Sequence, residues 1–232
     1  MMGLLKRTDS WNQVVSLDLE TKVLAPDQFL SGERILAAGI SYRVGKEIKS
    51  KVVMLENDTE QAELELLERL GHELYVANPL VLLGYNITGY DFPLLLMKIK
   101  KYDDWQKSKA APGTRAQFSR DYWHLKDALT RSVIFDVMHA ARYRIGRHDN
   151  VPPKYLKLSD VIAHSMFSGL PLKKCKGIAA SDASESKGEK IFRMWKEKDP
   201  LLTEYLIGDV HDTLMIAEEL FSKDISVKPF LP

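Results

Sequence analysis

Two carboxylates lie two positions apart in the stretch V-V-S-L-D-L-E-T at residues 14–21. The apolar residues around Asp18 and Glu20 predict a β-strand, in which side chains two apart share a face, roughly 7 Å from each other along the chain. Unpaired carboxylates on an inward face lose hydration and repel each other, so a cation must compensate them. Taken alone, the motif also fits a strand end whose acids reach solvent or meet Lys or Arg.

A further acid follows the apolar run L-V-L-L-G-Y-N at residues 80–86. This run is typical of a central strand covered on both faces, and α/β sheets commonly place their sites at such strand ends. Asp91 is therefore a candidate ligand. It is equally a candidate N-cap, because Pro93 fits the first turn of the helix expected to follow.

The last predicted helix contributes a tyrosine and another acid. Tyr205 and Asp209 are four residues apart, so they share one helix face. The alternatives are a core aromatic for Tyr205 and a solvated charge for Asp209, although Asp209 lies beside the apolar stripe of this helix. We expect the neighbouring His211 and Asp212 to be surface residues.

The chemistry that these residue types favour is that of a hard divalent cation. Oxygen-only ligands suit Mg²⁺ or Mn²⁺, whereas Zn²⁺ prefers His or Cys, of which the sequence shows no suitable cluster. Two such ions about 4 Å apart are the recurring device of in-line phosphoryl chemistry. The like charges on the first strand are then held together by cations.

The elements that must position these residues form one mixed sheet with helices packed on it. Strands are expected at 12–19, 35–43, 51–55, 80–86 and 132–140, the first three antiparallel. Helices are expected at 59–78, 90–102, 158–167, 187–198 and 201–222, with a short element at 122–129. We expect residues 103–131 to be otherwise irregular, 142–157 to be a basic loop, and 170–186 to be mobile.

Bulk composition fits a single α/β domain. The chain has 232 residues, of which 45% are hydrophobic and 28% charged, with a net charge of +1 that neither requires nor excludes a nucleic-acid partner. Its one cysteine, Cys175, excludes an intramolecular disulfide. No apolar run reaches the about 18 residues of a membrane span, and no membrane partner is expected. We expect a cytoplasmic protein.

Together the motifs resemble those of the 3′–5′ exonucleases with four catalytic acids and a motif-three tyrosine, the DEDDy subclass. The likeness is greatest to the proofreading exonuclease domain of family B DNA polymerases. It rests on S-L-D-L-E-T (16–21), L-G-Y-N-I-T-G-Y-D-F-P (83–93) and Y-L-I-G-D (205–209), supported by I-F-D-V (134–137) and Y-L-K-L-S-D-V (155–161). The resemblance spans about residues 12–222, so we expect a single free-standing exonuclease domain over 1–232, without a polymerase domain.

The resemblance implies an RNase H-like fold and two Mg²⁺ or Mn²⁺ ions. Asp18, Glu20 and Asp209 would hold the first ion, and Asp18 would bridge to the second, with Asp91 acting directly or through water. Tyr205 would orient the attacking water as a hydrogen-bonding group.

Three further residues are implied as substrate contacts. Thr21 would contact the terminal nucleotide and Asn86 the substrate backbone. Phe92 is a candidate for packing near the terminal bases, although we expect it mainly in the core.

The implied activity is the release of nucleoside monophosphates from the 3′ end of single-stranded DNA. The same chemistry on RNA stays open, because the discriminating contact is to a 2′-hydroxyl. A catalytically silent nucleic-acid-binding or assembly module is the alternative from another class. Residues 103–131 and 170–186 have no counterpart in the family pattern and are expected to set substrate choice. The basic residues at 142–157 and 173–176 fit either phosphate contacts or a solvated face.

Overall fold

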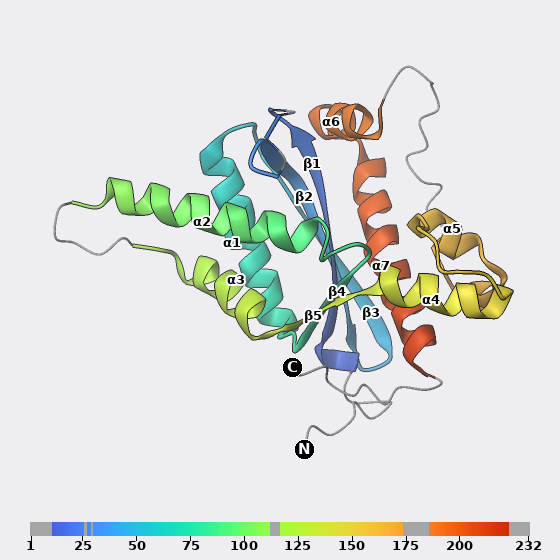
Figure 1. Ribbon diagram of the computed structural model, residues 1–232. Coiled ribbons are helices and arrows are strands. Elements are labelled where there is room, and N and C mark those ends of the chain that lie inside the picture. The colour runs from blue at the N-terminus through green and yellow to red at the C-terminus, as the bar shows by residue number, and fades with distance from the viewer. Residues whose placement is uncertain (1–10, 26, 29, 112–116, 174–185, 223–232) are drawn as a thin grey trace.

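The computed structural model describes residues 11–25, 27–28, 30–111, 117–173 and 186–222, which build one twisted sheet between two helical layers (Figure 1). The strand order is β3-β2-β1-β4-β5. The strands are β1 (Val14–Val23), β2 (Glu33–Val44), β3 (Glu47–Met54), β4 (Val81–Gly84) and β5 (Val133–Asp136). β1, β2 and β3 pair antiparallel, while β4 pairs parallel with both β1 and β5. The predicted mixed five-stranded sheet is confirmed.

Helices cover both faces of the sheet. In Figure 1, α1, α2 and α3 lie on one side, α4, α5 and α7 on the other, and α6 near the far end of β1. The α-helices are α1 (Glu60–Ala77), α2 (Asp91–Lys109), α3 (Arg120–Arg131), α4 (Val137–Asp149), α5 (Leu158–Ala163), α6 (Lys187–Glu197) and α7 (Pro200–Ser222). Two short 3₁₀ turns are η1 (Trp11–Gln13) and η2 (Ser165–Phe167). Within the described residues, no helix is both long and apolar enough to cross a membrane.

The ends of α1 follow from its sequence. The Thr59 side chain caps the helix by accepting a hydrogen bond from the N–H of Ala62, and Asn78 ends it in the left-handed conformation at φ 47°. At Gly71 the helix meets α3 so closely that a Cβ atom would lie 2.0 Å from the carbonyl oxygen of Asp121. A glycine is therefore required where these two helices pack.

The predicted elements need three corrections. The strand expected at 132–140 ends at Asp136, because the Asp136 side chain caps α4 by accepting a hydrogen bond from the N–H of Met138. The basic loop expected at 142–157 is helical as far as Asp149, with Ile145 buried beneath the arginines.

The third correction concerns residues 103–131, which are mostly helical rather than irregular, since α2 runs to Lys109 and α3 fills 120–131. Outside the described residues lie 112–116 and, within the segment expected to be mobile, 174–185.

The longest helix, α7, lies across β1 and β2. Its fully buried Leu206 and Val210 pack over Gly39 of β2, where an added Cβ would come within 2.8 Å of the Leu206 side chain. Gly39 is the residue that pairs with Asp18 in the β1–β2 ladder. The absence of a side chain at this position allows α7 to approach the acid-bearing face of β1 closely.

Candidate active site

The acidic part of β1 lies beyond the point where its neighbour β4 ends. β4 pairs only with Val14–Ser16, so the later residues of β1 have no strand on that side. A register shift falls between Glu20 and Thr21. Such a bulge redirects the side chains that follow it, and bulges are frequent next to active sites. The part of β1 that carries the acids therefore has no neighbouring strand on the side of β4, beyond the carboxyl end of that strand.

Three acids from distant parts of the chain meet here. Asp18 and Glu20 of β1 and Asp209 of α7 each offer a carboxylate oxygen, and these oxygens lie within 4.8 Å of one another. Glu20 is 6% exposed, so the cluster is largely withdrawn from water. The structure thus brings together three of the four acids singled out in the sequence.

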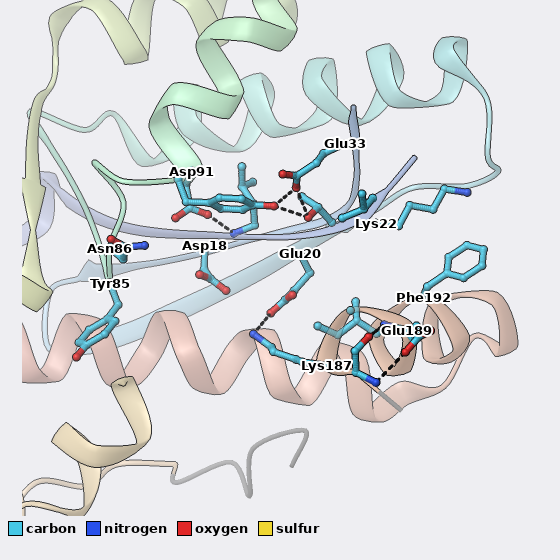
Figure 2. A pocket seen from close by; sticks show the side chains of 17 residues that line it. Asp18, Glu20, Lys22, Glu33, Tyr85, Asn86, Asp91, Lys187, Glu189 and Phe192 are labelled. Atoms are coloured by element: carbon cyan, nitrogen blue, oxygen red, sulfur yellow. Dashed lines mark hydrogen bonds and ion pairs between the residues drawn. The ribbon is translucent and has the colours of Figure 1, made fainter. Parts of the chain in front are cut away.

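The fourth acid, Asp91, lies in the same pocket but faces the backbone of β1 (Figure 2). Its Oδ1 accepts a hydrogen bond of 3.0 Å from the N–H of Leu19, in the region where β4 no longer pairs. The expectation that Asp91 is the N-cap is wrong: Tyr90 occupies that position and Asp91 is the first helical residue. Asp91 is 3% exposed.

A lysine that the sequence analysis did not single out compensates the cluster. The Nζ atom of Lys187, the first residue of α6, lies 3.1 Å from the Glu20 carboxylate and 5.2 Å from the ring centre of Tyr205. Burial acts to lower the pKa of Lys187, but the charges of Glu20 and Asp18 outweigh burial and raise it. One ammonium group thus faces several carboxylates.

The four acids singled out in the sequence all have a raised pKa, chiefly because they are buried. Burial, reinforced by the charge of Asp91, raises the pKa of Asp18 well above its usual value, and burial also raises that of Glu20. For Asp91, burial raises the pKa to about 8, against the opposing hydrogen bond from Leu19. For Asp209, burial raises it to about 6 although Tyr205 donates a hydrogen bond to its carboxylate.

Tyr205 lies one turn before Asp209 on α7, and its side chain is 9% exposed. Burial, followed by the charge of Asp209, strongly raises the pKa of its phenol. The hydroxyl therefore stays protonated and acts as a hydrogen-bond donor, here towards Asp209 and Glu20. The four-residue spacing correctly predicted that Tyr205 and Asp209 share one helix face. In the structure, the phenol of Tyr205 lies at the acid cluster rather than in an apolar core.

The acids open into a pocket of about 640 Å³ (Figure 2). Thr21 and Asn86, two of the residues expected to contact substrate, line it. Phe92 does not: it packs against the main core, as its apolar type suggested. The aromatic side chains in the lining are Tyr85, Tyr90 and Phe192.

A buried carboxylate organises one wall of this pocket. Glu33, 6% exposed, accepts hydrogen bonds from the hydroxyl of Thr21 at 2.8 Å and from that of Tyr90. Lys98 donates to the backbone carbonyl of Glu33. Burial is the main cause that raises the pKa of Tyr90, which keeps its hydroxyl a donor. Two pocket hydroxyls are therefore held in fixed orientations.

A second carboxylate fixes the turn that carries Asn86. The two oxygens of Asp136 accept hydrogen bonds from the N–H of Asn86, at 3.1 Å, and from the N–H and hydroxyl of Thr88, at 3.2 and 2.7 Å. Asn86 has the left-handed φ of 65°, and a Cβ on Gly89 would lie 2.5 Å from its Oδ1. The turn is compact and closely defined.

The structure also shows where Asp212 and the basic residues at 142–157 lie. Asp212 is not a surface residue: it is 1% exposed, and its Oδ1 accepts hydrogen bonds from the N–H of Lys173 at 2.8 Å and from the ring of His211 at 2.9 Å. These two hydrogen bonds explain how the Asp212 carboxylate can be buried. Among the described residues, none from 142–157 lines the pocket.

Comparison with known proteins identifies the fold. No protein-family model and no curated protein sequence matches this chain. Among solved structures, it is similar to the family B DNA polymerase from the hyperthermophilic archaeon Pyrobaculum calidifontis, with a TM-score of 0.56 and 20% identity over 89% of this chain. The match covers 24% of the polymerase chain, so this chain spans about a quarter of its length. The likeness, with the sheet order, confirms the predicted RNase H-like α/β fold.

Proposed function

We propose that this protein is a metal-dependent 3′–5′ exonuclease that acts on single-stranded DNA and releases nucleoside monophosphates. The observation that carries the proposal is that carboxylate oxygens of Asp18, Glu20 and Asp209 lie within 4.8 Å of one another, with Asp18 and Glu20 lining the pocket. Folding has withdrawn these acids from water without supplying an equal number of cations. Bound protons or a bound cation must compensate the negative charge of such an arrangement.

The donor set fits hard divalent ions. Every ligand atom is a carboxylate oxygen, which Mg²⁺ and Mn²⁺ prefer, and burial raises the pKa of all three acids, so their charged forms favour a cation partner. We assign Asp18, Glu20 and Asp209 to a first ion, and Asp18 with Asp91 to a second. When bound, the pair would supply Lewis-acid activation of water and stabilisation of the leaving oxygen.

The other residues act on the substrate and the attacking water. Tyr205, held protonated, orients the water by hydrogen bonding rather than by removing its proton. The Thr21 hydroxyl and the Asn86 amide offer polar contacts to the terminal nucleotide and its backbone. The aromatic rings of Tyr85, Tyr90 and Phe192 offer faces on which bases of any sequence stack.

The proposal is tested with single-stranded DNA and RNA labelled at the 5′ end, each incubated with Mg²⁺ or Mn²⁺ and without metal. We expect a ladder that shortens from the 3′ end with either metal, and faster degradation of DNA than of RNA. Asp18→Ala should abolish the ladder while binding of DNA is retained. The matched control is Asp127→Ala, which removes an exposed carboxylate, 66% exposed, on α3 and should leave the rate unchanged.

Each alternative predicts a distinct result. Faster degradation of RNA than of DNA would show that RNA is the preferred substrate of the same reaction. Binding without degradation by the wild-type protein would favour the silent binding module. Activity that survives in Asp18→Ala would contradict the assignment of the acid cluster.

A further inference from the structure

A second group of metal-ligating side chains lies apart from the acid pocket. His148 and Asp149 end α4, and His164 follows the last residue of α5. Within the described residues, this group and the acid cluster are the sets of three or more His, Cys, Asp or Glu whose donor atoms lie within 4.8 Å of one another. None of the three residues lines the active-site pocket.

The three side chains converge on the Asp149 carboxylate. Its Oδ1 lies 2.7 Å from Nδ1 of His148, and its Oδ2 lies 3.1 Å from Nε2 of His164. Donor atoms of a tetrahedral zinc site are separated by about 3.3 Å, as follows from zinc–nitrogen bonds of about 2.0–2.1 Å. The spacing from Asp149 to His164 matches this value within a few tenths of an ångström, and the spacing to His148 is shorter by about 0.6 Å, so the His148 and Asp149 side chains must move apart slightly to hold one ion.

The chemistry of the donors differs from that of the acid cluster. Two imidazoles and one carboxylate suit borderline ions such as Zn²⁺, Co²⁺ or Ni²⁺, whereas all-oxygen sites suit Mg²⁺ and Mn²⁺. His148 is 51% and His164 18% exposed, so an ion can enter and water can complete the coordination. The last turn of α4, with its partly negative carbonyl groups, also favours a cation at this position.

Binding requires one local change at His164. Its Nδ1 accepts a hydrogen bond of 3.3 Å from the N–H of Met166, so the ring proton of the ion-free protein lies on Nε2 and is directed at Asp149. Ligation through Nε2 moves that proton to Nδ1 and gives up the bond from Met166. This bond is at the long end of the normal range, so its loss is a small opposing contribution.

We propose that His148, Asp149 and His164 form a second metal site, selective for a borderline divalent ion with water as a further ligand. The site links the end of α4 to the end of α5, because Asp149 and His164 are 15 positions apart in the sequence. Its role is structural: α4 and α5 already share one hydrophobic core through Ile145 and Val161, and the ion adds a link between their ends.

The direct test is titration of the metal-free full chain with Co²⁺, whose visible absorption reports four-coordinate binding. His148→Ala and His164→Ala should each lose this absorption and weaken Co²⁺ binding at least tenfold. His72→Ala is the matched control, because His72 is 57% exposed and also lies beside an aspartate, Asp121, but outside the converging group. Asp18→Asn, which disables the acid cluster, should keep the absorption.

Thermal unfolding supplies a second measurement. In chelator, all four variants should be folded, and the two histidine variants should melt close to the wild type. Zn²⁺ should raise the melting temperature of the wild type and of Asp18→Asn, but not that of the double variant His148→Ala, His164→Ala. The proposal is overturned if the absorption survives in both histidine variants, if it disappears in Asp18→Asn, or if Zn²⁺ stabilises the double variant as much as the wild type.

Discussion

Replacing Asp91 with asparagine should stabilise the metal-free protein at neutral pH while abolishing the proposed exonuclease activity. The pKa of Asp91 rises from 3.8 to about 8 on folding because the carboxyl group is buried. The folded state therefore binds this proton more tightly than the unfolded state does. Stability falls as the pH rises from about 4 to about 8, because the slope follows the difference in bound protons.

The magnitude follows from the same values. One pKa unit corresponds to about 1.4 kcal/mol, so at pH 7.5 the raised pKa of Asp91 disfavours the folded state by about 5 kcal/mol, an upper figure because neighbouring acids titrate with it. Asparagine keeps an oxygen that accepts the hydrogen bond from Leu19 but carries no charge. At pH 5 the same relation gives about 1.6 kcal/mol, so the advantage of the variant should be about 3 kcal/mol smaller than at pH 7.5.

The assay is urea unfolding of both proteins at pH 5 and pH 7.5 in chelator, with Asp127→Asn as an exposed control that should show no pH-dependent difference from the wild type. We expect the stability gain of Asp91→Asn over the wild type to be about 3 kcal/mol larger at pH 7.5 than at pH 5. Mg²⁺ should narrow this gap, because a bound cation compensates the wild-type charge. A stability difference that is the same at both pH values would refute the explanation that ionisation of the buried Asp91 carboxyl group destabilises the folded state.

Three further substitutions test other parts of the site and the fold. Lys187→Gln should bind Mn²⁺ several-fold more tightly by calorimetry, because Nζ no longer competes for Glu20. Gly71→Ala should lower the free energy of unfolding by about 1–3 kcal/mol in urea, since its Cβ would lie 2.0 Å from a backbone oxygen of α3. Asp136→Ala should cost about 2–4 kcal/mol, because three backbone N–H groups, one of them buried, lose a charged acceptor, and should weaken the proposed DNA binding as well.

Each of these predictions has its own control or contrary result. Unchanged or weaker Mn²⁺ binding by Lys187→Gln would show that the lysine does not occupy the cation position. Gly188→Ala, which has no atom within 4 Å of the added Cβ, should be neutral or stabilising by up to about 1 kcal/mol. For Asp136, the conservative Asp136→Asn should recover part of the loss, and equal losses in both variants would argue against the hydrogen-bond explanation.

Sequence reasoning succeeded where a local pattern decides the structure. The alternation around Asp18 and Glu20 predicted a strand with both acids on one face, and the four-residue spacing predicted Tyr205 and Asp209 on one side of a helix. The short connections between the first strands predicted their antiparallel order. These features depend on neighbours in the chain, so the sequence alone contains them.

Where tertiary contacts decide, the same reasoning failed. Lys187 meets Glu20 across 167 positions, and no local pattern reports such a pair. Asp136 lies in an apolar run that suits a strand and a helix equally, and only its hydrogen bonds define the boundary. The sequence suggested a solvated charge at Asp212, but its carboxylate accepts a hydrogen bond from the backbone N–H of Lys173, which belongs to a distant segment. The end of α2 has few buried residues because it extends beyond the sheet, so its sequence showed no helical stripe.

The Asp136 carboxylate binds two segments of the chain, the start of α4 and the turn that carries Asn86. It holds the first turn of α4 through the N–H of Met138 and the pocket turn through the N–H groups of Asn86 and Thr88. One side chain therefore connects the start of α4 to the pocket turn. The proposed second metal site lies at the other end of the same 13-residue helix, so α4 spans the distance between that site and the pocket turn.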